Sequence, residues 1–197
     1  MNFKSVIFAF CALFFVTAPI QAEVVNVSPN GFLIRHEVQL NVPAEQAYEL
    51  MVNQVSLWWN PSHTYSQNAK NLSIDARPGG CFCEKLPNGG GVQHLSVVFV
   101  APGKTLRMTG ALGPMQGSGL AGSMTWDFSA IKPAKAIAGA ATEASADTSK
   151  AVSKLVLTYS VGGYMLGGFD KMAPGADGML AEQVGRYKNL VNTGKPD

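Results

Sequence analysis

The sequence predicts an α+β domain in which a curved antiparallel sheet wraps around one long C-terminal helix. Short segments with alternating apolar and polar residues follow one another between residues 71 and 161, and turn sequences such as Pro102-Gly103 separate them. A single helical stripe of apolar residues follows at 179–192. A meander of this length has to bury one face, and the last helix supplies the complementary apolar surface.

The first 22 residues have the organisation of an export signal. Lys4 precedes an unbroken apolar run over residues 6–16, and the small residue Ala22 ends the segment. The run is too short to span a bilayer, so a cleaved signal is favoured over an uncleaved anchor. We expect cleavage after Ala22, a single domain over residues 23–197 with no membrane span, and a periplasmic or secreted location.

The composition favours a protein that binds small apolar molecules. The formal net charge is +2, only 14% of the residues are charged, and the chain has 21 glycines and 8 methionines. Nucleic-acid binding requires a concentration of Lys and Arg that this chain lacks. Gly117–Gly122 matches a dinucleotide fingerprint by letter, but a strand follows it where a helix is required, so no cofactor is expected.

The N-terminal half of the domain begins with a strand and a helix. Residues 33–42 alternate, and His36 shares the apolar face. Pro43 stands where a helix over residues 44–53 can start. Trp58 and Trp59 follow in a turn, where they either pack in the core or cap a ligand cavity.

The rest of the chain predicts hairpins and the closing helix. A sequence rich in Ala between the last two strands, about 132–151, has no apolar periodicity and reads as a mobile or loosely helical extension of a hairpin. The glycines between residues 110 and 122 indicate a flexible segment at a cavity mouth. The expected strands span 71–77, 81–86, 92–100, 105–112, 120–130 and 154–161, and the helical stripe consists of Leu180, Val184, Tyr187 and Val191.

This order of elements carries a resemblance to a known superfamily. Together with the segments Gly79–Glu84, Val92–Leu95 and Gly110–Pro114 and the closing helix, it resembles the START/Bet v 1-like (SRPBCC) superfamily over most of residues 30–192. Within that superfamily it is most similar to the polyketide cyclase/dehydrase and Aha1-like groups. The resemblance implies a helix-grip fold and a scaffold that binds lipids or aromatic molecules, and the Aha1-like relatives imply a protein partner as an alternative.

The hairpin loop at 87–91 predicts a register for the two strands that flank it. Glu84 should face His94. Across the next turn Phe99 should face Leu106, and Val97 should face Met108. The apolar face would then carry Cys81 and Cys83, and the Glu84–His94 pair would lie on the outer face. A carboxylate beside an imidazole is the minimum for acid–base catalysis, but the favoured interpretation is a surface ion pair.

The two cysteines of the mature chain allow three interpretations. In an extended strand the Cα atoms of Cys81 and Cys83 are nearly 7 Å apart, which is the outer limit for a disulfide. Buried thiols are favoured over a strained bridge and over two metal ligands. A metal site lacks convincing partners among His36, His63 and His94, so none is expected.

The functional hypothesis is a periplasmic carrier for a small hydrophobic or aromatic ligand. The walls of its cavity are expected to include Trp58, Trp59, Cys81, Cys83, Met108, Met124 and Tyr159. An enzyme on the same scaffold, a cyclase, dehydratase or hydrolase that uses His36 or the Glu84–His94 pair, is the first alternative. A protein-interaction module that uses the outer face of the sheet is the second. His36 by itself is interpreted as a core histidine.

Overall fold

The computed structural model describes residues 22–131 and 152–197. The predicted signal segment, except Ala22, and the sequence at 132–151 lie outside the described residues, so the predictions made for them stay predictions. No helix among the described residues is long and apolar enough to cross a membrane.

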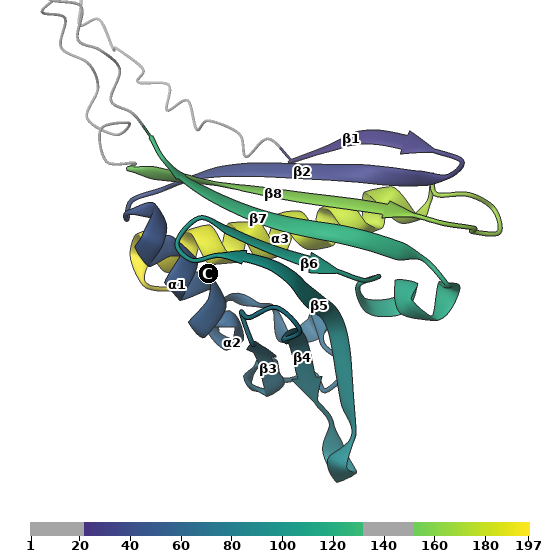
Figure 1. Ribbon diagram of the computed structural model, residues 1–197, viewed down its shortest axis with the longest axis horizontal. Coiled ribbons are helices and arrows are strands. Elements are labelled where there is room, and N and C mark those ends of the chain that lie inside the picture. Colours follow the sequence, from purple (N-terminus) through teal and green to yellow (C-terminus); the bar gives the residue numbers. More distant parts are fainter. Residues whose placement is uncertain (1–21, 132–151) are drawn as a thin grey trace, which may run out of the picture.

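The domain is built on one antiparallel sheet of eight strands in the order β1-β2-β8-β7-β6-β5-β4-β3 (Figure 1). Neighbours in this order follow one another along the chain except at β2–β8, where the first and last parts of the chain meet. The strands are β1 (Ala22–Ser28), β2 (Gly31–Leu40), β3 (Leu72–Ile74), β4 (Cys81–Lys85), β5 (Gly91–Ala101), β6 (Thr105–Thr109), β7 (Ala121–Ala130) and β8 (Ser153–Gly162).

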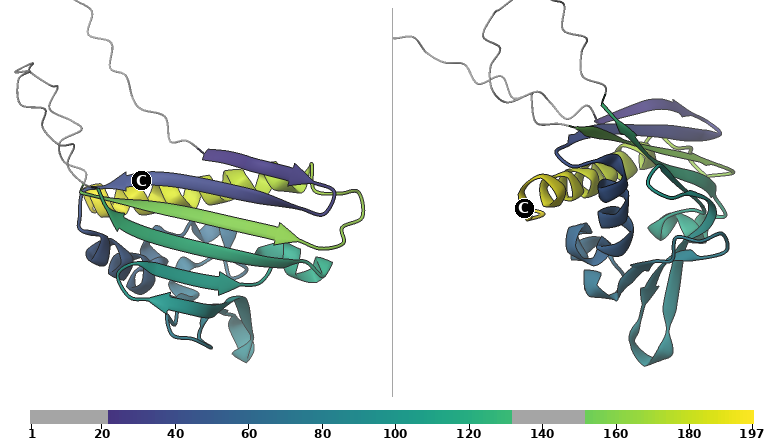
Figure 2. Two further views of the ribbon diagram at one scale, coloured as in Figure 1. Left: turned by 45° about the horizontal axis from the view of Figure 1, so that its top comes forward. Right: turned by 60° about the vertical axis from the view of Figure 1, so that its left-hand side comes forward.

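The helices lie together on the concave side of this sheet (Figures 1 and 2). The longest of them runs along the strands and closes the core. The α-helices are α1 (Ala44–Asn53), α2 (Val55–Trp58) and α3 (Met172–Thr193), and the short 3₁₀ turns are η1 (Pro61–His63), η2 (Ala69–Asn71), η3 (Pro87–Gly89) and η4 (Gly113–Ser118). This arrangement confirms the predicted α+β class, and the architecture is that of a helix-grip fold.

The predicted alternation decides which side chains enter the core. Along β2 and β8 every second residue is buried, beginning with Phe32 and Ser153. Leu180, Val184 and Tyr187 of α3 are fully buried against them, as the helical stripe predicts. Val191 is only half-buried, because the last turn of α3 runs toward the edge of the core.

Helix α3 begins seven residues before the predicted start at Met179. Pro174 is tolerated there because the first-turn N–H groups of a helix have no intrahelical partner. Gly175 and Gly178 weaken the intrinsic propensity of this segment. Burial of Ala173 against the core outweighs that preference, which sequence periodicity alone does not show.

Strand β1 was not predicted, although its sequence has the features of a hairpin strand. It pairs with β2 through a tight turn in which Ser28 stands opposite Gly31. The β-branched residues Val24, Val25 and Val27 and the Asn30-Gly31 turn are typical of a hairpin arm. The strand has a register shift between Val24 and Asn26, which interrupts the simple alternation.

The pairing of β5 with β6 confirms one predicted contact and corrects another. Val97 stands opposite Met108 as predicted, but the register shifts between Val97 and Phe99, so that Phe99 faces Arg107 and not Leu106. The extra residue turns Phe99 outward. Its ring is 46% exposed and lies 5.4 Å from the Arg107 guanidinium carbon.

Cys81 and Cys83 form a disulfide, so the interpretation as buried thiols is wrong. Their Cα atoms are 5.4 Å apart, well inside the range that a disulfide accepts, because β4 is locally shorter than an ideal extended strand. Both residues are half-buried and face away from the core, while Phe82 and Glu84 face inward. The predicted orientation of this strand is therefore reversed.

Loss of the disulfide is expected to have a modest effect on stability. The double change Cys81→Ser and Cys83→Ser should lower the free energy of unfolding by about 1.6 kcal/mol, because so short a loop restricts the unfolded chain only slightly. Urea denaturation of the oxidised and reduced protein measures this difference. Dithiothreitol should leave the double variant unchanged, and a loss above about 4 kcal/mol would contradict the loop argument.

Candidate functional site

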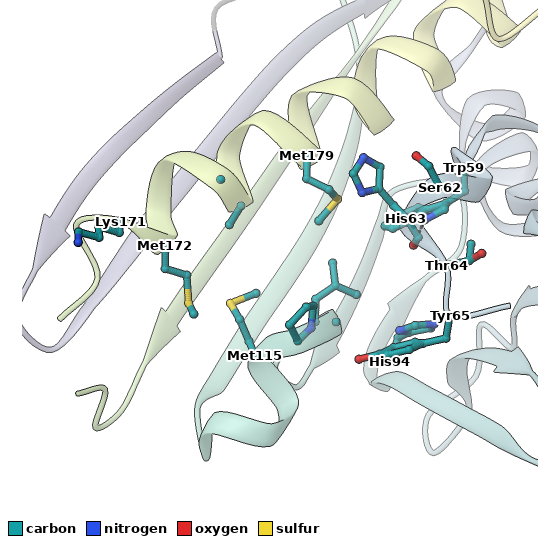
Figure 3. Close-up of a pocket in the computed structure, with 15 residues that line it drawn as sticks. Trp59, Ser62, His63, Thr64, Tyr65, His94, Met115, Lys171, Met172 and Met179 are labelled. Atoms are coloured by element: carbon teal, nitrogen blue, oxygen red, sulfur yellow. Dashed lines mark hydrogen bonds between the residues drawn. The ribbon is translucent and has the colours of Figure 1, made fainter. Parts of the chain in front are cut away.

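An open cleft of about 490 Å³ lies between the N-terminal half of α3 and two loops (Figure 3). One loop follows α2 and continues through η1, and the other follows β6 and enters η4. The cleft is lined by Trp59, Ser62, His63, Thr64, Tyr65, His94, Leu112, Gly113, Pro114, Met115, Lys171, Met172, Gly175, Ala176 and Met179.

The walls of this cleft are mainly apolar and adaptable. Met172 and Met179 approach it from α3, and Met115 approaches from η4 on the other side (Figure 3). Methionine side chains are flexible and polarisable, so they fit ligands of differing shape. Lys171 also lines the cleft; it lies at the edge and is exposed.

The methionines and the tyrosine predicted for the cavity wall lie elsewhere. Met108, Met124 and Tyr159 are buried in the core and do not line the cleft. The strand pattern placed them on the correct face of the sheet, but α3 and the aromatic core fill the space above that face. The cleft lies beyond them, toward the beginning of α3.

Tyr159 supports the cleft from behind. Its hydroxyl donates to the carbonyl of Gly110 at 3.1 Å and accepts from the N–H of Leu112 at 2.8 Å. Burial raises the pKa of Tyr159 to about 12, so the hydroxyl keeps its proton. Position 122, beside the Tyr159 ring, requires glycine, because a Cβ atom at this position would lie 2.6 Å from the backbone oxygen of Gly110. Tyr159 thus holds the segment that enters η4, and the flexibility predicted for the glycines at 110–122 stays a prediction.

The two tryptophans divide between the core and the cleft. Trp58 is 1% exposed, and its indole N–H donates to the carbonyl of Met51 at 3.2 Å. Trp59 lines the cleft and donates to the carbonyl of His63 at 3.0 Å. Trp58 is therefore a core residue, and Trp59 is 3% exposed, so the interpretation that Trp59 caps a ligand cavity stays a prediction.

The predicted register of β4 and β5 is wrong by two positions at Glu84. Glu84 stands opposite Val92, and Phe82 stands opposite Leu95. The register shifts between Phe82 and Cys83, and His94 is the extra residue on β5. Such a bulge reorients one side chain, so His94 and Leu95 are both buried although they are neighbours in sequence.

This bulge brings Glu84 and His94 together in the interior, where the prediction placed them on the outer face. The Nε2 atom of His94 lies 3.0 Å from Oε2 of Glu84. The Glu84 carboxylate also accepts the backbone N–H groups of Tyr65 at 3.1 Å and Ser66 at 2.5 Å. The alternative of a surface ion pair is excluded, because Glu84 is 2% and His94 4% exposed.

The carboxylate and the imidazole respond differently to burial. Burial acts to raise the pKa of Glu84, but hydrogen bonds from Ser66, Tyr65 and His94 outweigh it and lower that pKa. Burial lowers the pKa of His94, and the adjacent Glu84 offsets only part of this effect. A charged carboxylate therefore holds a neutral imidazole at neutral pH.

Two aromatic rings lie against the ring of His94. Tyr65 stacks on it with ring centroids 6.0 Å apart (Figure 3). Phe82 approaches it with centroids 5.0 Å apart. The Nδ1 atom of His94 is buried and has no hydrogen-bond partner. His94 is thus positioned at one end of the cleft by its strand, its carboxylate partner and two rings.

A second carboxylate–histidine pair fastens the loop after α2 onto α3. The Nε2 atom of His63 lies 2.9 Å from Oε2 of Glu182. Asn60 also bonds the Glu182 carboxylate, and its backbone N–H donates to the side chain of Gln183 at 2.7 Å. Hydrogen bonding from Asn60 lowers the pKa of Glu182. About 120 residues separate the partners, so no sequence pattern indicated this contact.

His36 does not line the cleft. It is fully buried on β2, and its Nε2 atom lies 3.1 Å from Oδ1 of Asp177 on α3. Burial lowers its pKa although Asp177 acts to raise it. His36 therefore stands in the core, as its apolar strand face predicted, and away from the candidate site. Within residues 22–131 and 152–197, no group of three or more His, Cys, Asp or Glu side chains could hold a metal ion.

Comparison with solved structures agrees with the fold. The chain is similar to a conserved protein of unknown function, EF2215 from Enterococcus faecalis, with a TM-score of 0.55 at 11% identity over 88% of this chain and 78% of that protein. It is also similar to protein CV1439 from Chromobacterium violaceum, with a TM-score of 0.51 at 16% identity over 83% of this chain and 98% of that protein. At these identities the likeness shows the fold alone.

No protein-family model matches the chain, and no curated protein matches it. Sheet, helix and cleft define an α+β protein of the helix-grip type with an apolar cleft at one end of its long helix. A neutral, carboxylate-held histidine closes that cleft on one side.

Proposed function

We propose that the protein binds a small hydrophobic or aromatic molecule in the cleft between α3 and the loops at 59–65 and 112–115. The observation that carries this proposal is a cleft of about 490 Å³ lined by three methionines and an indole ring. Pockets of this size, mainly apolar with a few polar groups, are typical of sites for small molecules.

The proposal includes a cellular role and a family. The export signal supports a carrier that acts in the periplasm or outside the cell. The helix-grip architecture supports membership of the START/Bet v 1-like superfamily, in the exported polyketide cyclase/dehydrase or Aha1-like groups. A carrier can consist of a single domain without a cofactor, because it acts by removing the apolar surface of its ligand from water.

Filling the cleft with a larger side chain is expected to block binding. Ala176 lines the cleft on α3, so Ala176→Phe should weaken binding about tenfold or more through overlap with the ligand. Intrinsic fluorescence, to which Trp59 contributes from the cleft wall, can follow titration with dodecanoic acid, a flavonoid and a sterol. The affinity should follow apolar surface and change little between about 0.03 M and about 0.5 M salt.

Ala181→Phe is the matched control for this experiment. Ala181 lies on the same helix and is also half-buried, but it does not line the cleft. It should retain the affinity of the unaltered protein, and thermal unfolding of both variants identifies any loss of fold. Equal binding by Ala176→Phe, or no binding of any of the three ligands to the unaltered protein, would contradict the proposal.

The Glu84–His94 pair favours a second candidate function, acid–base catalysis on the bound molecule. A buried carboxylate that orients a neutral imidazole is an arrangement used for proton transfer. The hydroxyls of Ser62 and Thr64 also line the cleft, but Thr64 donates to the carbonyl of Pro61 at 2.7 Å. Proton transfer is thus better supported than nucleophilic attack. Solvent-deuterium incorporation into a bound aryl ketone, lost in His94→Gln, would establish it.

A further inference from the structure

His94 keeps one ring nitrogen without a partner. Its Nε2 atom faces the Glu84 carboxylate at 3.0 Å, and an ionised carboxylate can only accept hydrogen bonds. The proton of the neutral ring therefore lies on Nε2, which leaves a lone pair on Nδ1. Nδ1 has no hydrogen-bond partner, although His94 is only 4% exposed. Most buried acceptors in native proteins have a partner, so this one requires an explanation.

The neighbouring side chains do not supply the missing donor. The rings of Phe82 and Tyr65 lie against the imidazole at centroid distances of 5.0 and 6.0 Å and offer it no donor on their ring carbons. The Gln116 amide reaches the same strand but donates to the backbone carbonyls of Gln93 at 2.7 Å and His94 at 3.2 Å. What remains beside His94 is the cleft, whose walls are mainly apolar and which His94 itself lines.

We infer that the cleft selects aromatic molecules that carry a hydroxyl group, and that this hydroxyl donates a hydrogen bond to Nδ1 of His94. This inference rests on the proposed binding function and specifies its ligand class. The apolar ring of the ligand lies among the methionines, and its phenolic O–H points toward His94. Tyr65 is 53% exposed, so rotation of its side chain opens the path to Nδ1 without disturbing the core.

A pair of matched ligands tests this selection. Isothermal titration calorimetry of the full mature protein compares 4-propylphenol with 4-propylanisole, in which a methyl group replaces the donor hydrogen. The phenol should bind roughly three- to tenfold more tightly, the effect of one net hydrogen bond. In His94→Phe, which keeps an aromatic ring beside Tyr65 and Phe82, the two ligands should bind within about twofold of each other.

Tyr164→Ala is the control, because Tyr164 is 80% exposed and does not line the cleft. It should keep the preference for the phenol. Equal binding of phenol and anisole to the unaltered protein, or a preference that survives in His94→Phe, overturns the inference while leaving the proposed function intact. Failure of both ligands to bind to the unaltered protein overturns the proposed function as well.

The protonation of the ring can be observed without any variant. Nitrogen-15 NMR of the unaltered protein at neutral pH should show an unprotonated Nδ1 and a protonated Nε2 for His94. Addition of 4-propylphenol should shift the Nδ1 resonance, whereas 4-propylanisole should leave it in place. A protonated Nδ1 in the free protein would overturn the inference, because that atom could not then accept a hydrogen bond.

Discussion

Tyr187→Ala is expected to lower the free energy of unfolding by about 4 kcal/mol. Tyr187 is fully buried on α3, and its ring makes edge contacts with Trp58, Trp126 and Phe128 at centroid distances of 5.6, 6.4 and 6.4 Å. Its hydroxyl donates to the carbonyl of Ala47 at 2.6 Å. One side chain thus joins α3 to α1, α2 and β7, and its removal leaves a cavity in rigid surroundings.

Two further variants separate the contributions of packing and hydrogen bonding. Tyr187→Phe keeps the ring but leaves the Ala47 carbonyl without its donor, so it should lose only about 1–2 kcal/mol. Tyr164→Ala removes a ring that is 80% exposed and should change the free energy of unfolding by less than about 0.5 kcal/mol. Urea denaturation followed by circular dichroism measures all three. A loss below about 2 kcal/mol in Tyr187→Ala would contradict the role of this residue as the central contact.

Acidification is expected to destabilise the fold before its carboxylates titrate. Burial lowers the pKa of both His36 and His94 in the folded protein, so the unfolded chain binds more protons as the pH falls below about 6.5. Their stabilising contribution is therefore complete above that pH and is lost as the pH falls toward the folded pKa. At pH 5.5 the loss should reach as much as about 1.4 kcal/mol for each histidine.

A further loss of folding stability should follow at lower pH. It is again caused by acidification, but the group that titrates is Glu84. The pKa of Glu84 is lowered in the folded protein, so its contribution is complete above about pH 4.5 and is lost as the pH falls through the folded value. Denaturation curves at several pH values between about 2 and about 8 measure both steps. His94→Gln, which does not titrate, should remove about half of the first step. A free energy of unfolding that does not change between pH 7.5 and 5.5 would show that neither histidine is held neutral.

Local patterns in the sequence were sufficient for most of the elements. The alternation at 33–42, the helix that Pro43 begins and the stripe from Leu180 to Tyr187 each depend on which residues lie two, three or four positions apart. Those intervals are fixed by the geometry of a strand and of a helix, so they can be read without knowledge of distant partners. The fold class followed from the order of these elements.

The candidate site depends on contacts that no local pattern contains. A single extra residue, His94, shifts the register of β4 and β5, turns the Glu84–His94 pair inward and reverses the face of the cysteines. Side-chain alternation has a period of two, so one bulge changes every expected orientation beyond it.

The sequence by itself therefore determined the α+β class, the faces of the central strands and the burial of the closing helix. Only the tertiary structure decided where the cleft lies, because its walls come from four separate parts of the chain, at residues 59–65, 94, 112–115 and 171–179. The aromatic core around Tyr187 fills the space between sheet and helix, and the cleft lies at the edge of that packing, beside Trp59, Met115 and the first turns of α3. Close packing of the interior is the physical reason, since it leaves voids only where side chains from distant segments fail to meet.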